Sequence, residues 1–413
     1  MNVLQFVANL FVNVGAWMGE VLHGWGLSPL WTAIVVKFLA GLVVAGGPLA
    51  AVLFLIWYAR KVIGRIQDRM GPTNDGTAAG PFALLQAVAD AIKMLTKEFI
   101  FPHGRDKVVF LIAPVLVVAV AVAIWAVIPF GPPDAGMQFV DLNIGVFYVV
   151  ALASLTFFSM LMAGWSSHNK YANLGAFRAV SMIVSYEIPQ MLALLVPVML
   201  AGTMGMQGLI NAQEVPFIVM APIPALIYFL AMTAEVGRLP FEQAEADAEI
   251  VAGYFIEYSG MLFGAFYLAE FINNLSASFV FSVLFLGGWR GPWVEQAPIL
   301  GLVWLSLKAF LVFSVLTFFW GAMPRLRIDH ILGFSWKFLT PLALVMLMVT
   351  ALVDKIVQIV GERGPSPSVS PWTRAGWLFL ANAIVALVTA WVLYQVEKRQ
   401  RAQREARRFA VVR

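Results

Sequence analysis

Long apolar runs separated by short polar segments dominate this chain of 413 residues. About twenty consecutive apolar residues are enough for an α-helix to cross a lipid bilayer. The pattern therefore predicts an all-α membrane bundle with nine crossings, the first at 31–57. The other spans are expected at 107–128, 143–163, 178–200, 216–236, 251–286, 298–321, 336–357 and 372–394. The 251–286 run is longer than one crossing needs, so it is expected to tilt, bend or break.

Two further segments are expected to lie at the membrane surface. Residues 82–98 carry apolar side chains at helical spacing on one side and polar ones on the other, which predicts an amphipathic helix in the interface. Its polar side includes Asp90 and Lys93, and the plain alternative is that both simply face solvent. Residues 1–30 are read as an N-terminal interfacial extension, with a helix over 2–22.

The composition changes the picture by excluding several classes of protein. The chain is 61% hydrophobic and 12% charged, which is far from the balance of a soluble domain. It contains no cysteine, so it cannot bind an iron–sulfur cluster through its own thiolates. Its four histidines lie outside the clearest spans, which argues against a haem held between membrane helices. The net charge of +4 is attributed to topology, not to nucleic-acid binding.

Basic residues are distributed unevenly between the two sets of loops. If the loop over 58–106 is cytoplasmic and the spans alternate, 21 of the 27 Lys and Arg residues fall inside. That asymmetry agrees with the positive-inside rule. It predicts a multi-pass protein of the cell membrane whose basic tail, 398–413, is cytoplasmic because the ninth span returns the chain inward.

Acidic residues gather around one stretch, 234–249, between two apolar runs. Acids at membrane depth are costly and usually mark ion or proton routes. A plainer alternative for part of the set is that Pro240 begins a helix whose first turn favours Glu242 and Glu245. The acids in and after this stretch are Glu235, Glu242, Glu245, Asp247, Glu249, Glu257 and Glu270.

Nine motifs in order along the chain resemble the membrane subunit of respiratory complex I that joins the membrane arm to the redox arm, the bacterial H subunit. They run from the first span to about residue 357. The motifs are QDRMGP at 67–72, LQAVADAIK at 85–93, GWSSHNKY at 164–171, SYE at 185–187, RLPFEQAEADAE at 238–249, IEYSGM at 256–261, LGGW at 286–289, PRLRID at 324–329 and WKFLTPL at 336–342.

The resemblance implies eight core transmembrane helices and a tunnel for ubiquinone or menaquinone. It assigns quinone-side positions to Arg60, Asp90 and Lys93, with Arg325 near the tunnel mouth. It assigns a proton path to Glu187, Glu235, Glu242, Glu245, Asp247, Glu257 and Glu270. Without the resemblance, Arg60 would be read as a positive-inside anchor, and Arg325 as a ligand for lipid phosphate.

The resemblance also implies partners and leaves rivals open. Electrons would come from soluble redox-arm subunits carrying FMN and iron–sulfur clusters, docked on the cytoplasmic loops, beside other membrane-arm subunits and lipid. NADH is the expected donor, whereas the rival is a homologous subunit of a membrane-bound hydrogenase or of a ferredoxin- or F420-driven complex. A secondary transporter is the rival from another class, but no internal repeat is visible.

The chain departs from the family pattern at a few places. Ala59 stands where the family usually has a glutamate beside the basic pair, and His330 stands where glutamine is usual. The expected organisation is an extension over 1–30, a quinone and proton domain over 31–357, an added helix with its loop over 358–397, and the basic tail over 398–413.

Overall fold

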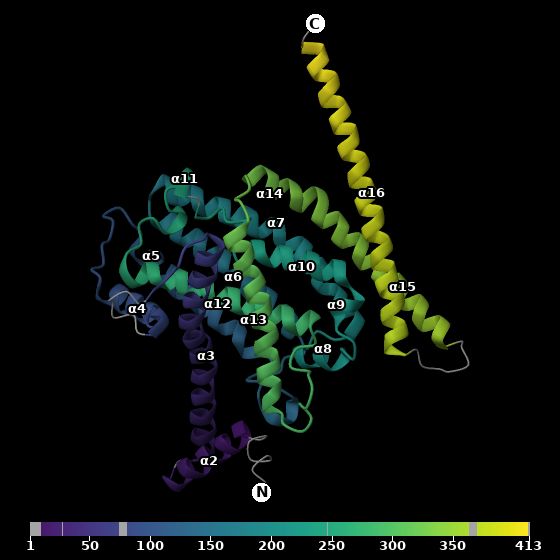
Figure 1. Ribbon diagram of the computed structural model, residues 1–413. Coiled ribbons are helices and arrows are strands. Elements are labelled where there is room, and N and C mark those ends of the chain that lie inside the picture. Colours follow the sequence, from purple (N-terminus) through teal and green to yellow (C-terminus); the bar gives the residue numbers. More distant parts are fainter. Residues whose placement is uncertain (1–9, 27, 74–80, 246, 363–369, 412–413) are drawn as a thin grey trace.

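The computed structural model describes residues 10–26, 28–73, 81–245, 247–362 and 370–411, and every regular element in this part of the chain is helical. The long helices are shown in Figure 1. The elements are α2 (Leu10–Gly24), α3 (Pro29–Ile66), η1 (Pro81–Ala83), α4 (Gln86–Thr96), α5 (Lys107–Ala123), η2 (Ile124–Val127), η3 (Pro133–Ala135), α6 (Gly145–Ser166), α7 (Lys170–Ala201), α8 (Met206–Ala212), α9 (Phe217–Met220), α10 (Pro222–Glu235), α11 (Asp247–Ile250), η4 (Gly253–Phe255), α12 (Gly260–Phe285), α13 (Ile299–Ala322), α14 (Ile328–Phe334), η5 (Ser335–Leu339), α15 (Thr340–Glu362) and α16 (Pro371–Val411).

Within the described residues, eight helices are long and apolar enough to cross a membrane. These are α3, α5 with η2, α6, α7, α12, α13, the continuous helix from α14 to α15, and α16. Their outward faces carry many exposed large apolar side chains, as expected where the solvent is lipid. The prediction of an all-α, multi-pass membrane bundle is confirmed.

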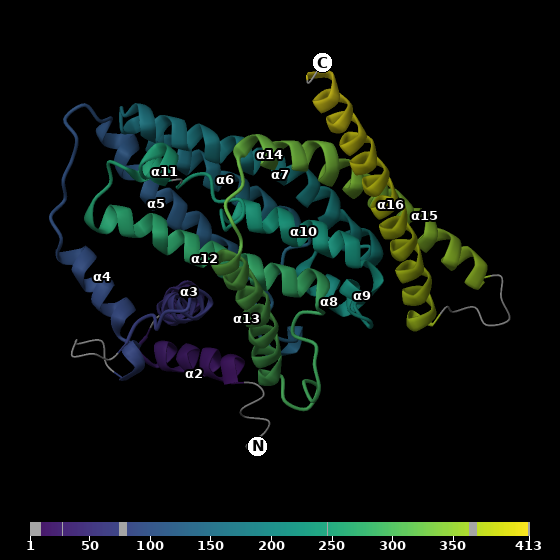
Figure 2. The ribbon, with the colours of Figure 1, turned by 45° about the horizontal axis from the view of Figure 1, so that its top comes forward.

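Helix α12 forms the centre of the bundle. In its most apolar stretch 78% of the residues are buried, against 11% in α16. It packs against α5, α13 and α3, while α7 packs against α6, α10 and α15. Figures 1 and 2 show α3 and α4 at one edge and the α15–α16 pair at the opposite edge.

The span expected at 216–236 is broken. Helix α9 ends at Met220, and α10 begins at Pro222, whose ring leaves no backbone N–H to continue the hydrogen-bond ladder. The 14 residues of α10 cover about 21 Å, which is short of the ~30 Å hydrocarbon core. This crossing is therefore made by two pieces and not by one uniform helix.

The 251–286 run, which was expected to tilt, bend or break, is broken. Helix α12 begins only at Gly260, and residues 251–259 form a turn with positive φ at Val251 and Gly253. A Cβ on Gly253 would lie 1.8 Å from the carbonyl oxygen of Ala244, so only glycine fits this close approach. Glu257 consequently lies in the turn before the span, and its expected position inside a membrane helix is wrong.

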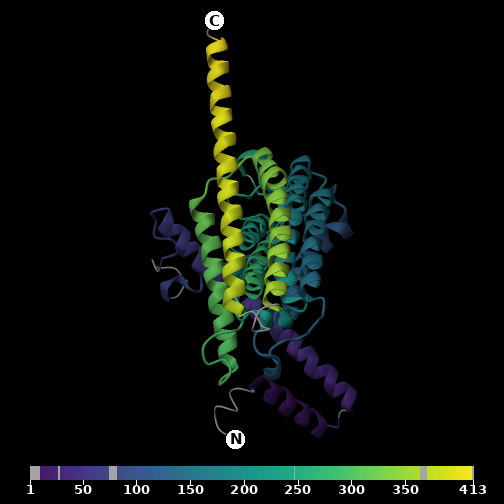
Figure 3. The same ribbon diagram turned by 90° about the vertical axis from the view of Figure 1, so that its right-hand side faces the viewer.

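Several helix ends differ from the expected ones. Helix α3 runs on to Ile66, so Arg60 belongs to its last turns and not to a loop. The expected helix start at Pro240 is wrong, because residues 239–245 form turns and α11 starts at Asp247. Helix α16 continues without a break through the basic tail to Val411 and extends beyond the bundle, as Figure 3 shows.

The two segments expected at the membrane surface both form helices. Helix α4, within the expected 82–98, turns the apolar side chains of Val88, Ile92 and Leu95 outward. Helix α2 lies across the end of α3 in Figure 1, and residues 1–9 of the expected extension are outside the described part of the chain. Their placement in the membrane interface stays a prediction.

Candidate functional site

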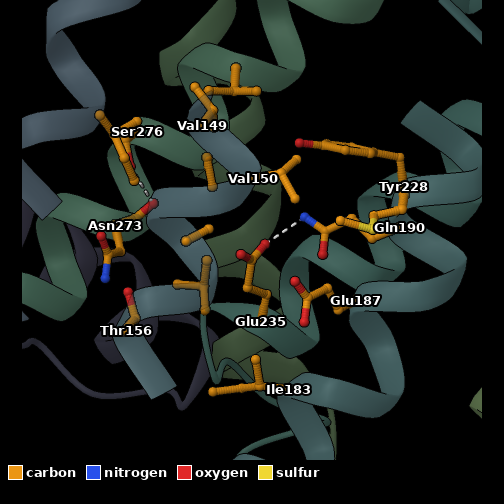
Figure 4. Close-up of a pocket in the computed structure, with 16 residues that line it drawn as sticks. Val149, Val150, Thr156, Ile183, Glu187, Gln190, Tyr228, Glu235, Asn273 and Ser276 are labelled. Atoms are coloured by element: carbon orange, nitrogen blue, oxygen red, sulfur yellow. Dashed lines mark hydrogen bonds between the residues drawn. The ribbon is translucent and has the colours of Figure 1, made fainter. Parts of the chain in front are cut away.

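Two carboxylates, Glu187 of α7 and Glu235 at the end of α10, lie beside each other between packed helices. Their charges are close enough to interact, and Figure 4 shows both side chains at the same cavity. The side-chain amide of Gln190 donates a hydrogen bond to Glu235 Oε2 at 2.5 Å, and the hydroxyl of Ser154 on α6 donates to Glu187. We call these four residues the inner acid site.

The cavity beside the inner acid site is polar enough and large enough to hold water. Its volume is about 60 Å³, and a water needs about 10–15 Å³ of such space, so it accommodates about four molecules. Thr156, Tyr228, Asn273 and Ser276 supply polar groups in its lining. The side-chain oxygen of Asn273 is buried without a protein partner. Both carboxylates therefore adjoin a space that can hold water.

A second group of acids surrounds a buried arginine. Arg238 is 3% exposed, and its guanidinium lies 2.9 Å from Glu270 Oε1 on α12. Its cationic carbon lies 3.9 Å from the ring centre of Trp320 and 4.8 Å from that of Phe271. Nε and one terminal nitrogen of this guanidinium are buried without a hydrogen-bond partner. Aromatic faces thus take the place of some of the acceptors that a buried guanidinium normally requires.

Glu242 and Glu245 complete this second group. Arg325 lies 3.1 Å from Glu242, and the hydroxyl of Tyr267 donates to Glu245 at 3.4 Å. Burial raises the pKa of Glu242, although Arg325 opposes this shift. Burial, together with the charges of Glu270 and Glu242, raises the pKa of the Glu245 carboxyl well above its usual range. We call Arg238, Glu242, Glu245, Glu270 and Arg325 the outer acid cluster.

The remaining predicted acids do not join either group through a hydrogen bond or ion pair in the described part of the chain. Glu257 accepts a hydrogen bond from the amide of Asn169 at 2.7 Å. Glu249 pairs with Arg178 at 2.5 Å and is half exposed. Asp247 starts α11, but its side chain lies outside the part that the structure describes. The seven acids thus divide between different local environments.

The predicted quinone-side residues are held together at the junction of α3 and α4. Asp90 lies 2.6 Å from Arg60 and 3.6 Å from Lys93, and it also accepts a weak bond from Gln86 at 3.4 Å. Arg325 lies elsewhere, paired with the outer acid cluster. Ala59, where the family usually has a glutamate, is buried in the core. Arg60 and Lys93 remain largely exposed, so they are accessible to a ligand or partner.

Sequence reasoning missed four residues that contact these acids. Gln190 follows Glu187 by three residues and therefore shares its helix face, a signal that was available in the sequence. Arg238 belongs to a quoted motif, but nothing in the sequence indicated its burial. Ser154 and Asn169 are distant in sequence from Glu187 and Glu257, and only the packing of α6, α7 and the 251–259 turn brings them together.

The fold and these sites define a class: a polytopic helical membrane protein with ionisable groups inside its bundle. The sequence matches the model of the NADH dehydrogenase family over residues 39–351. It is 45% identical to the H subunit of NADH-quinone oxidoreductase from Dehalococcoides mccartyi over 79% of this chain and 88% of that protein. It is 40% identical to the H subunits from Carboxydothermus hydrogenoformans and Paraburkholderia phymatum, over 83% and 82% of this chain and 96% of each relative. The chain belongs to the NADH dehydrogenase family represented by these proteins.

Proposed function

We propose that this chain is the membrane subunit of a proton-translocating NADH-quinone oxidoreductase that lines the quinone site and couples quinone reduction to proton movement. The observation that carries the proposal is the inner acid site, where Glu187 and Glu235 meet at a cavity between membrane helices that also exposes polar groups of Thr156, Asn273 and Ser276. The names of the 40–45% identical relatives support the reaction.

The inner acid site supplies groups that can exchange a proton. Neighbouring carboxylates at low dielectric repel each other when both are ionised, so they take up and release protons as a coupled pair. Gln190 donates a hydrogen bond to Glu235, and Ser154 donates one to Glu187. A change in nearby charge would then alter the protonation of the pair. That response is what a coupling site has to provide.

The outer acid cluster brings together three parts of the chain. Arg238, Glu242 and Glu245 come from the segment before α11, Glu270 from α12, and Arg325 from the segment after α13. Glu245 has its pKa raised well above the usual range, so it keeps a proton at a pH where an exposed glutamate has lost it. Reduction of a quinone to a quinol consumes two electrons and two protons. We infer that the transient negative charge on the quinone changes the protonation of the outer acid cluster. The changed charge of this cluster would then alter the protonation of the inner acid site.

The α3–α4 junction is proposed as the quinone side of the chain. A quinone tail requires apolar surface, and its headgroup requires a few polar contacts. Helix α4 offers both, because its apolar side is exposed while Asp90 is held against Arg60. Arg60 and Lys93 would orient the headgroup or a partner that covers it.

Electrons are proposed to arrive from soluble subunits that hold FMN and iron–sulfur clusters. These subunits would dock on the cytoplasmic side of the chain, which would include the basic end of α3 and the turns at 239–245. The chain itself has no cysteine with which to ligate a cluster. Other membrane-arm subunits and lipid would cover the outward faces of the bundle.

The test replaces Glu187 or Glu235 by glutamine in the assembled complex. Glutamine keeps the shape and much of the hydrogen bonding but removes the titrating group. Electron transfer from NADH to an artificial acceptor that bypasses quinone should be unchanged, whereas quinone turnover and acidification in the same membranes should fall about a hundredfold. Glu397→Gln is the matched control, because Glu397 is an exposed acid paired with Arg401 on α16, outside the cavity. Full quinone turnover and pumping in both variants would refute the proposal.

A further inference from the structure

Helix α16 lies outside the family-matched segment, 39–351, yet it makes polar contacts with the bundle. Most of its large apolar side chains are exposed, among them Trp377, Leu387 and Trp391. Only one face packs against α15, α9 and α10. On that face, Arg374 and Asn382 are polar residues joined by hydrogen bonds to other elements. The residues to which they are hydrogen-bonded lie on α7, α15 and the α9–α10 break.

Arg374 joins α16 to α15 and to the end of α7. Its guanidinium holds both carboxylate oxygens of Asp354, with Nε at 2.6 Å and a terminal nitrogen at 2.9 Å. The same terminal nitrogen donates to the carbonyl oxygen of Leu200 at 3.2 Å. Asp354 is 7% exposed and also accepts from Gln358. A bidentate pair of this kind fixes direction as well as distance.

Asn382 fills the break between α9 and α10. Its side-chain nitrogen donates to the carbonyl oxygen of Met220 at 3.2 Å, and its oxygen accepts from the backbone N–H of Ile223 at 3.4 Å. The side chain is 1% exposed. Backbone groups freed by the break at Pro222 would be costly if they were left unpaired among membrane helices. One amide from α16 satisfies a group on each side of the break.

The two anchored elements, α7 and α10, carry three of the four residues of the inner acid site, Glu187, Gln190 and Glu235. At 1.5 Å per residue, Leu200 is about 15 Å along α7 from Gln190, and Ile223 is about 18 Å along α10 from Glu235. The two helices pack closely against each other. The 2.5 Å bond between Gln190 and Glu235 joins the middle of α7 to the end of α10 that is far from α16. A slip of one helix by a single residue, ~1.5 Å, would break that bond.

We propose that α16 is an internal brace in which Arg374 and Asn382 act as positioning residues for the inner acid site. They hold the end of α7 and the start of α10 in a fixed register, and this register brings Gln190 to Glu235. The functional part of this inference rests on the proposed function, whereas the structural part does not. If α16 served only to face lipid or a neighbouring protein, replacing Arg374 or Asn382 would not change the contact between Gln190 and Glu235, which lies about 15–18 Å away along the helices.

The test measures the register directly, using the absence of native cysteine. In one background, Gln190 and Glu235 are both replaced by cysteine, and the full chain in its native membranes is treated with a short bis-methanethiosulfonate reagent. Asn382→Leu or Arg374→Met is then added. Thr389→Val serves as the control, because the Thr389 hydroxyl donates to the carbonyl oxygen of Val385 in the same helix. We expect the cross-linking yield to fall at least fivefold in the first two variants, because each variant loses two or more hydrogen bonds between helices and a single such bond contributes ~1 kcal/mol. The control should be unchanged.

A second measurement separates this inference from the proposed function. In the cysteine-free background, Asn382→Leu should lower quinone turnover relative to artificial-acceptor activity in the same membranes, and Thr389→Val should not. Unchanged cross-linking in both Asn382→Leu and Arg374→Met overturns the brace. Reduced cross-linking together with full turnover in Glu187→Gln and Glu235→Gln supports the brace and rejects the proposed function of the acids.

Discussion

Replacing Arg238 by methionine should destabilise the bundle strongly, and most of the effect should depend on Glu270. Arg238 is 3% exposed and lies 2.9 Å from Glu270, whose side chain is 19% exposed. Removing one partner of a buried pair leaves an uncompensated charge and costs about 3–5 kcal/mol. The ring contacts with Trp320 and Phe271 add about 0.5–2 kcal/mol that belongs to Arg238 alone.

A double-mutant cycle separates these two contributions. The variants are Arg238→Met, Glu270→Gln and the double variant, purified in mild detergent and compared by the temperature at which tryptophan fluorescence reports unfolding. The double variant should be more stable than the sum of the single changes predicts, with a coupling free energy of about 1–3 kcal/mol, because neither member of the Arg238–Glu270 pair is left facing an empty partner position. Arg238→Met should be the least stable of the three.

The result that refutes this reasoning is additivity. If the double variant loses stability equal to the sum of the two single losses, Arg238 and Glu270 do not depend on each other. Thr389→Val is a suitable control, because its hydroxyl bonds only within its own helix. It should leave the unfolding temperature nearly unchanged. A large shift in the control would show that the assay responds to any polar replacement in the bundle.

Three further predictions concern pH, the quinone side and topology. Because the pKa of Glu245 is raised, wild-type quinone turnover should fall as pH rises through that pKa, and Glu245→Gln should move the fall to higher pH; identical pH profiles would contradict this. Asp90→Asn removes the anion that holds Arg60, so KM for a short-chain quinone should rise several-fold while artificial-acceptor activity stays constant; an unchanged KM would place these residues outside the quinone site. A reporter fused after the last residue should be active only in the cytoplasm; activity confined to the periplasm would reverse the topology.

The breaks in two spans show where sequence patterns lose information. Hydropathy counts apolar residues and cannot tell a continuous helix from two pieces of the same composition. Pro222 was visible, but its effect depends on whether another element can satisfy the freed backbone groups, as Asn382 does. The 251–259 turn depends on the close approach of Ala244 to Gly253. Such an approach is a property of packing.

The sequence by itself determined the class of protein and the identity of its chemical groups. Apolar runs long enough to cross a bilayer require helices, because only helices or closed barrels satisfy the backbone in lipid. The costly acids, among them Glu187, Glu235 and Glu270, were therefore recognisable without a structure.

Only the tertiary structure decided which groups meet. Glu187 and Glu235 are 48 positions apart, Arg238 and Glu270 are 32 apart, and Arg325 joins Glu242 across 83. Helix periodicity relates residues three or four apart, and contacts across such distances are set by how the helices pack. The contacts of α16 with the bundle could not be predicted for the same reason, since Arg374 and Leu200 are 174 positions apart in the sequence. Local patterns determine the helices, whereas the free energy of packing them determines the site.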